Sequence, residues 1–183
     1  MAQFMNGIKR TNYCGEVTKV NVGQTVVLTG WVAKVRNLGG LMFIWLRDRT
    51  GRIQLFFNEE TDKELFELAA GVKNEYVLAV EGLVCARNEA DVNKDMKTGE
   101  IEVKVTKVVI LNEAKLPPFH IEDKANISDV NRLKYRYLDL RRPSMQNVIL
   151  MRHKIAKIAR DYYDENGFVE VETPILTKST PEG

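Results

Sequence analysis

Two short stretches of alternating side chains, residues 41–47 and 52–57, place the strongest constraint on how this chain folds. Alternation with a period of two is the pattern of a half-buried strand. The turn-forming run Asp48-Arg49-Thr50-Gly51 separates the stretches, so the sequence predicts a β-hairpin with one apolar face. The apolar faces carry Met42, Ile44 and Leu46 and then Ile53, Leu55 and Phe57, and the opposite faces carry Phe43, Trp45 and Arg47 and then Arg52, Gln54 and Phe56.

The outer face of this hairpin combines rings, an amide and cations. Rings stack on unpaired bases and cations follow phosphates, so such a face suits single-stranded nucleic acid. An aromatic residue on the second face of a strand can equally pack beneath a loop or helix, and for Phe43 alone both interpretations stay open. The presence of Gln54 and three arginines around the same hairpin favours RNA or DNA.

The composition is that of an ordinary globular protein, and it excludes several classes of function. The 183 residues, 44% hydrophobic and 28% charged, suffice for one domain or for one domain and part of another. With a net charge of +2, a nucleic-acid site requires local placement of basic residues. We expect no metal site, no membrane segment and a reducing, cytoplasmic location, because Cys14 and Cys85 are far apart and no long apolar run occurs.

The hairpin belongs to a longer series of predicted elements. A strand over 25–36, with a bend expected at Gly30, comes before it, and a helix over 61–73 follows. Two further strands are predicted over 76–87 and from 101, where the alternation weakens after Lys107 towards Leu111, with a polar loop over 88–99 between them. Five strands with one helix between the third and fourth predict a five-stranded OB-fold barrel, whose second and third strands form the ligand face.

Beyond the barrel the pattern changes at Leu116-Pro117-Pro118, where prolines favour a linker. We divide the chain into a barrel domain (1–112), a hinge (113–140) that includes a helix over 129–140, and the start of an α+β domain (141–183). In the last part we expect a helix from Pro143 to the stop at Gly167, and a strand over 168–171 that ends at Pro174. The apolar stripe of that helix has no partner elements in the sequence, which predicts a truncated domain that either self-associates or stays disordered; the stripe consists of Val148, Met151, Ile155, Ile158 and Tyr162.

Several runs resemble bacterial-type aspartyl-tRNA synthetases of class II along essentially the whole chain. The specific ones are Arg136-Tyr137-Leu138-Asp139-Leu140-Arg141-Arg142-Pro143 and Thr180-Pro181-Glu182-Gly183. Phe168 to Pro174 is similar to motif 1 of class II synthetases, and Arg10-Thr11, Cys14-Gly15, Gly30-Trp31-Val32 and Leu46-Arg47-Asp48-Arg49 also fit the family.

The resemblance implies that the barrel reads a tRNA anticodon. Phe43 would stack on an anticodon base, with the central uridine favoured, and Gln54 would bond a base edge beside it. Arg36 would contact bases or phosphate. The first anticodon base or its backbone would be contacted by Arg87, Asn93 and Glu102, although Arg87 and Glu102 also suit ordinary surface positions on their strands.

One position departs from the family, since Trp45 stands where these synthetases usually carry Asp. Trp45 would form a second stacking surface or a packing residue, and both interpretations stay open.

The resemblance also implies the reaction of the whole enzyme. An aspartate–tRNA ligase activates L-aspartate with ATP and Mg²⁺ and transfers it to tRNA for aspartate, with asparagine tRNA as a second substrate in some members, and works as a homodimer. Pro174 would lie at the dimer interface and Glu182 would hold the aspartate ammonium group. Motifs 2 and 3 are absent from the 183 residues, so we expect this chain alone to bind no cofactor and to be inactive.

Two alternatives differ in class. One is a free-standing OB-fold module for single-stranded nucleic acid, and the other is an asparaginyl- or lysyl-tRNA synthetase of the same layout.

Overall fold

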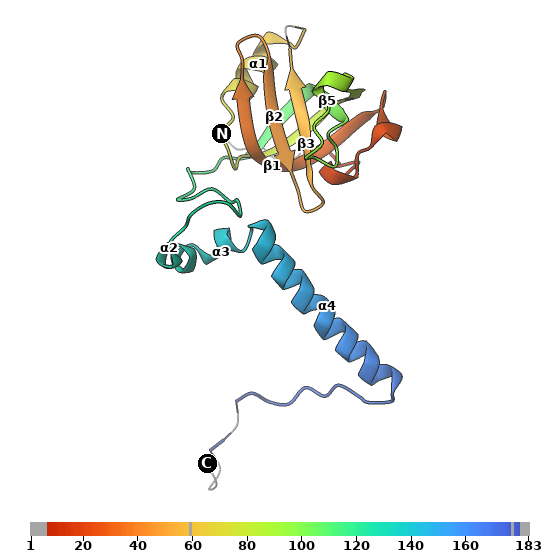
Figure 1. Cartoon of the computed structure of the whole chain (residues 1–183), viewed down its shortest axis with the longest axis vertical. Coiled ribbons are helices and arrows are strands. Elements are labelled where there is room, and N and C mark those ends of the chain that lie inside the picture. Colours follow the sequence, from red (N-terminus) through yellow and green to blue (C-terminus); the bar gives the residue numbers. More distant parts are fainter. Residues whose placement is uncertain (1–6, 59, 177, 180–183) are drawn as a thin grey trace. The chain divides into compact units, whose positions relative to one another are not determined.

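The computed structural model describes residues 7–58, 60–176, 178 and 179. The chain divides into two compact units, residues 1–117 and 118–183. The first unit is a closed five-stranded barrel with the strand order β1-β2-β3-β5-β4 (Figure 1). Its strands are β1 (Thr25–Asn37), β2 (Met42–Arg47), β3 (Arg52–Phe57), β4 (Val77–Ala86) and β5 (Ile101–Asn112), and the helix α1 (Lys63–Ala70) follows β3. The predicted OB-fold barrel, with one helix between strands three and four, is confirmed.

The barrel closes because two glycines let strands approach where a side chain would collide. A Cβ atom at Gly30 would lie 2.4 Å from the carbonyl oxygen of Arg47, and one at Gly82 would lie 2.4 Å from that of Lys104. The pairing of β4 with β5 shifts register beside Gly82, and that of β1 with β2 shifts between Val32 and Lys34, just past the predicted bend at Gly30. The parallel pairing of β3 with β5 then completes the ring.

The apolar faces of the predicted hairpin form the centre of the core. All six predicted inward side chains are fully buried, and the outward set of both strands is half-buried. Asp62 caps α1 by accepting hydrogen bonds from the backbone N–H groups of Glu64 and Leu65, and Ala69 lies in the core. The helix is shorter than the predicted 61–73, since Gly71 ends it.

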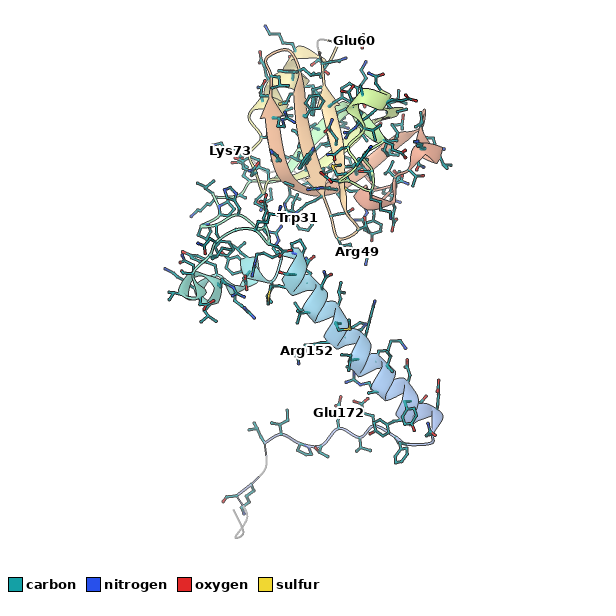
Figure 2. All side chains as sticks on the ribbon, in the orientation of Figure 1. Trp31, Arg49, Glu60, Lys73, Arg152 and Glu172 are labelled. Carbon is teal, nitrogen blue, oxygen red and sulfur yellow. The ribbon has the colours of Figure 1, made fainter. Side chains whose placement is uncertain are left out.

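The segment before β1 is bound to the turn between β2 and β3, the turn that carries Arg49 (Figure 2). The backbone N–H of Cys14 donates to Asp48 Oδ2 at 2.7 Å, and that of Gly15 donates to Thr50 Oγ1 at 2.9 Å. A Cβ atom at Gly15 would lie 2.3 Å from the carbonyl oxygen of Thr50, so only glycine allows this approach. Burial raises the pKa of the Cys14 thiol, which stays protonated.

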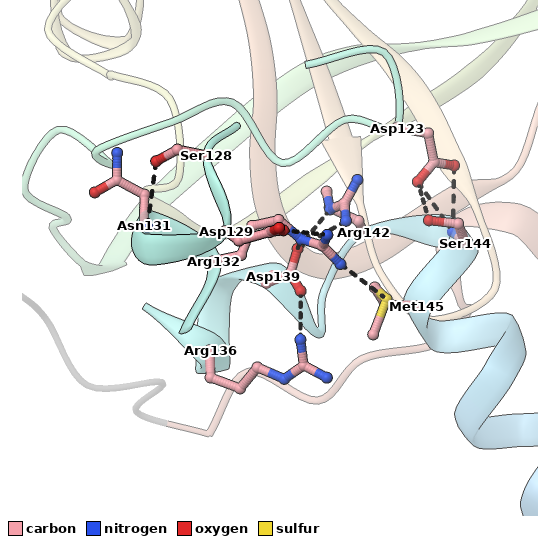
Figure 3. A network of polar contacts seen from close by, with 10 residues as sticks. All are labelled: Asp123, Ser128, Asp129, Asn131, Arg132, Arg136, Asp139, Arg142, Ser144 and Met145. Atoms are coloured by element: carbon pink, nitrogen blue, oxygen red, sulfur yellow. Dashed lines mark hydrogen bonds and ion pairs between the residues drawn. The ribbon is translucent and has the colours of Figure 1, made fainter. Parts of the chain in front are cut away.

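The second unit contains the helices α2 (Asp129–Lys134), α3 (Arg136–Asp139) and α4 (Pro143–Glu165). The predicted single helix over 129–140 is therefore wrong, because the backbone leaves helical geometry at Tyr135 (φ −111°, ψ 45°). The break lets arginines from three places converge on one carboxylate (Figure 3). Asp139, which is fully buried, accepts from Arg132 at 3.3 Å, from Arg136 at 2.9 Å and from Arg142 at 2.8 Å.

This cluster is the main polar connection of the second unit. Burial by itself would raise the pKa of Asp139, but the hydrogen bonds from Arg142 and Arg132 hold it below its ordinary value. At the start of α4, Asp123 accepts from both the backbone N–H and the hydroxyl of Ser144 (Figure 3), which satisfies a free donor of the first turn.

The helix α4 is exposed along its length, and its apolar stripe is between 54% and 66% exposed. It begins at Pro143 and stops before Gly167, which has a φ of 81°, as predicted. The predicted strand over 168–171 is wrong: these residues are irregular, and no strand in the described part of the chain pairs with them. The segment instead returns along α4 through the Arg160–Glu170 ion pair and an edge contact of Phe168 with Tyr163. None of the described helices is long and apolar enough to cross a membrane.

Candidate nucleic-acid interface

Two rows of outward side chains cross the barrel on β1, β2, β3 and β5. Strand register sets the first row, since Trp45 lies opposite Lys34 on one side and opposite Gln54 on the other. Glu102 extends this row, because the parallel pairing that joins Leu55 to Val103 brings Gln54 beside it. The second row lies two residues along each strand and contains Arg36, Phe43, Phe56 and Lys104.

Hydrogen bonds join three side chains of the first row, and an ion pair adds Arg87 to them. The indole Nε1–H of Trp45 donates to Gln54 Oε1 at 3.2 Å, and Gln54 Nε2 donates to Glu102 Oε2 at 3.0 Å. Arg87 Nε lies 3.5 Å from the same carboxylate oxygen. Four side chains that the sequence predicts as site residues, from four strands or strand ends, therefore lie in one line.

Arg87 closes this line from the end of β4. Its side chain is 5% exposed, and its Nε donates to the carbonyl oxygen of Ile101 at 3.0 Å. The Nη2 atom is buried and has no hydrogen-bond partner among the described residues. A buried donor without an acceptor costs free energy, so the burial of Arg87 is only partly compensated by its contacts with Ile101 and Glu102.

Burial acts in opposite directions on the two charges of this pair. It raises the pKa of Glu102, against the hydrogen bond from Gln54 and the charge of Arg87. It lowers the pKa of Arg87, against the charges of Glu102 and Asp91. Each group is thus partly removed from water and depends on its neighbour for compensation.

The Trp45 ring has cations near it from both neighbouring strands. Lys34 Nζ lies 5.4 Å from the ring centroid and Arg52 Cζ lies 4.7 Å from it. These contacts fall within the range of cation–π attraction. The ring therefore lies among positive charges that an approaching phosphate would meet.

The second row is simpler. Phe43 is half-buried and lies opposite the exposed Arg36 on β1 and opposite Phe56 on β3. Lys104 ends the row on β5 and forms an ion pair with Glu60. Lys34 and Lys104 lie in these rows of the candidate site, and we did not predict them. Alternation across β1 could have found Lys34, two residues before Arg36, but finding Lys104 required the pairing of β3 with β5.

Asn93 lies in the loop before β5 and has a local role in the structure. Its Oδ1 accepts from the backbone N–H of Asp95 at 3.0 Å, and its backbone N–H donates to Gly99. The loop contacts β3, because Thr98 donates to the Arg52 carbonyl oxygen at 2.6 Å. Asn93 therefore shapes a loop beside the first row, whereas its side chain is not part of the row.

The two remaining predicted residues belong to the other unit. Pro174 lies in the irregular segment after α4 and is exposed, and Glu182 falls outside the described residues. No group of three or more His, Cys, Asp or Glu side chains in the described part of the chain is placed to hold a metal ion.

Comparison with known proteins places both units in families. Residues 26–111 match the model of the OB-fold nucleic acid binding domain, and residues 128–183 match that of class II tRNA synthetases (D, K and N). The chain is 59% identical over 174 residues to an aspartate–tRNA(Asp/Asn) ligase of Anoxybacillus flavithermus, covering 95% of this chain and 29% of that protein. It is 55% identical over 175 residues to an aspartate–tRNA ligase of Lactobacillus acidophilus, covering 96% and 28%.

Among solved structures, the crystal structure of asparaginyl-tRNA synthetase from Pyrococcus horikoshii complexed with asparaginyl-adenylate is similar, with a TM-score of 0.77 and 29% identity. The match covers 92% of this chain and 37% of that one. The chain thus spans somewhat less than a third of the curated relatives named above. With a nucleic-acid-binding barrel followed by a class II synthetase segment, and with relatives at 55% to 59% identity, the chain belongs to the aspartyl-tRNA synthetase family.

Proposed function

We propose that the barrel reads the anticodon of a tRNA, as part of an aspartate–tRNA ligase that activates L-aspartate with ATP and transfers it to that tRNA. The observation that carries the proposal is the line Trp45–Gln54–Glu102–Arg87 on the face where OB folds bind oligonucleotides. The relatives named above, aspartate–tRNA ligases over nearly the whole of this chain, support the choice of amino acid.

The two rows divide the work of recognition. Phe43 offers a ring on which one base stacks, a contact worth roughly 1–3 kcal/mol that tolerates any base. Selection between bases therefore comes from polar groups, with Gln54 able to donate and accept and Glu102 able to accept from an amino group. Arg36, which is exposed, supplies positive charge for phosphate or base oxygens. Arg87 is 5% exposed and acts on the site through its ion pair with Glu102.

Chemistry on aspartate requires parts of the protein beyond these residues. The chain spans less than a third of its aspartate–tRNA ligase relatives, and we propose that ATP and Mg²⁺ bind in the other part of the enzyme. Glu182 would contribute to the aspartate pocket and Pro174 to a homodimer interface. The 183-residue chain alone should form no aspartyl-adenylate, which a pyrophosphate-exchange assay would test.

Two related functions compete with this proposal. An asparaginyl-tRNA synthetase is one alternative, because the structure of such an enzyme is similar to this chain. The relatives also differ in the tRNA that they are named for, since they include both aspartate–tRNA and aspartate–tRNA(Asp/Asn) ligases. A free-standing nucleic-acid module is disfavoured, because residues 128–183 match a synthetase domain that such a module does not need.

Binding of an RNA stem-loop with an aspartate anticodon to the 183-residue chain tests the anticodon role. Phe43→Ala should weaken binding by about 1–3 kcal/mol for every loop sequence, because it removes stacking. Gln54→Ala should reduce the preference for uridine at the middle position. Unchanged binding in both variants would contradict the proposal. Loss of affinity without any dependence on the bases would instead support a general single-strand binder.

A further inference from the structure

We propose that Trp45 is a positioning residue that fixes the side-chain amide of Gln54 in one orientation, and that this orientation makes the site select uracil over cytosine. The inference rests on the proposed function and adds a specificity determinant to it.

The amide of Gln54 lies between two groups of fixed and opposite character. An indole N–H can only donate, so the atom that faces Trp45 must be the oxygen, as observed at 3.2 Å. An ionised carboxylate can only accept, so the atom that faces Glu102 must be the nitrogen, as observed at 3.0 Å. A rotation of the amide by half a turn would lose both hydrogen bonds and would place oxygen against carboxylate.

Each amide atom keeps capacity for a ligand after these bonds are made. A carbonyl oxygen has two lone pairs and an NH₂ group has two hydrogens, so Gln54 retains one acceptor site and one donor site. Their order is fixed by Trp45 on one side and Glu102 on the other. The neighbours themselves have partners: Arg52 Cζ lies 4.7 Å from the centroid of the Trp45 ring, and Arg87 forms an ion pair with Glu102.

A fixed order of donor and acceptor distinguishes the two pyrimidines. Uracil presents O4, an acceptor, beside N3–H, a donor, whereas cytosine presents an amino group beside the acceptor N3. An amide that donates to O4 and accepts from N3–H would place donor against donor and acceptor against acceptor if cytosine took the same position. A freely rotating amide could turn to suit cytosine, and the amide held by Trp45 cannot.

Binding of RNA stem-loops that differ only by uridine or cytidine at the middle anticodon position tests this inference with the 183-residue chain. Trp45→Phe keeps a ring and removes the N–H donor. We expect the ratio of the two dissociation constants to fall roughly fivefold, the value of one net hydrogen bond. Lys34→Met serves as the matched control, because it removes a cation near the same ring. It should weaken both complexes equally and leave the ratio unchanged.

The outcomes separate this inference from the proposed function. If Gln54→Ala lowers the uridine preference and Trp45→Phe does not, the positioning role is wrong while anticodon reading stands. If neither Phe43→Ala nor Gln54→Ala changes binding, anticodon reading itself fails, and the positioning role fails with it.

If the Trp45→Phe variant does not fold, the hydrogen bond between Trp45 and Gln54 can still be tested by NMR on the free protein. The indole N–H of Trp45 should exchange slowly with solvent in NMR spectra and faster in Gln54→Ala. Equal exchange rates in the two proteins would overturn the hydrogen bond on which the inference depends.

Discussion

The two units of this chain bury their apolar side chains to very different degrees. In the barrel, the inward residues of β1 to β5 form one closed core, and strands along the whole ring satisfy each other's backbone groups. In residues 118–183, Leu138 is the one buried apolar side chain among those described, and α4 exposes an apolar stripe. The barrel therefore has the contacts of an independent folding unit, whereas the second unit has the secondary structure of a domain without its core.

The largest difference should appear when one core side chain of each unit is truncated. Leu55→Ala should destabilise the barrel by about 2–5 kcal/mol, because Leu55 is fully buried. Ile155→Ala, at a helix position that is 59% exposed, should change stability by less than about 0.5 kcal/mol. Denaturation followed by far-ultraviolet circular dichroism reports both units, and tryptophan fluorescence reports the barrel alone, because Trp31 and Trp45 both lie there. Similar losses of stability in the two variants would contradict the difference in packing between the two units.

The buried carboxylate of the second unit should matter more than any apolar residue there. Asp139→Asn removes the charge that compensates Arg132, Arg136 and Arg142. Because Arg132 and Arg136 are 32% and 47% exposed, water screens the cluster, and we expect a smaller loss than the roughly 3–5 kcal/mol of a fully buried pair. We expect α2 and α3 to lose helix protection in hydrogen exchange while the barrel keeps its own. Equal hydrogen-exchange protection of α2 and α3 in wild type and variant would show that the cluster contributes little.

Self-association provides a test of the exposed stripe. Apolar surface of this kind tends to find a partner, so the isolated chain should form concentration-dependent dimers in sedimentation velocity. Met151→Glu together with Ile155→Glu should shift the distribution to monomer, and Arg152→Glu, a charge reversal on the same helix, should not. A monomer at all concentrations with α4 fully ordered would contradict this prediction.

The smallest expected effect is on the pH dependence of the barrel. Burial by itself would raise the pKa of Asp48. Hydrogen bonds from the Cys14 backbone and from Thr50 outweigh burial and hold this pKa below its ordinary value. A carboxyl group whose pKa is lower in the folded than in the unfolded chain stabilises the fold at pH values above its unfolded-state pKa, about 4. This stabilisation is lost as the pH falls through the pKa of the folded state. Asp48→Asn should therefore flatten the decline of barrel stability below about pH 4. The measurement is the free energy of unfolding of the barrel at a series of pH values. The same decline below about pH 4 in wild type and variant would show that Asp48 contributes little.

Alternation within one strand could be predicted from the sequence, while contacts across distant strands could not. The inward and outward faces of 42–47 and 52–57 follow from the period of two, which places Phe43, Trp45 and Gln54 on one surface. The bond from Gln54 to Glu102 joins residues 48 positions apart through a parallel pairing, and no local pattern encodes it. The end of β5 was unclear for a similar reason, since Val108 and Val109 are both buried, which interrupts the alternation.

In the second unit the errors come from tertiary interactions. Helical spacing over 129–140 is genuine, yet the convergence of arginines on Asp139 accompanies a break at Tyr135 that spacing does not indicate. Phe168, Val169 and Val171 give residues 168–171 strand propensity, but a strand requires a partner strand for its backbone hydrogen bonds. Propensity therefore predicted an element whose hydrogen bonds nothing in the described residues can complete.

The two-residue spacing along β2 has a consequence for any RNA that covers Phe43 and Trp45 together. Side chains on one face of a strand repeat at about 6.8 Å, twice the rise of about 3.4 Å per residue. Successive bases in a nucleic-acid helix are separated by about 3.4 Å. Neighbouring bases cannot remain stacked on each other while each lies on one of these rings. If the barrel reads an anticodon as proposed, it should therefore favour loops whose bases unstack easily.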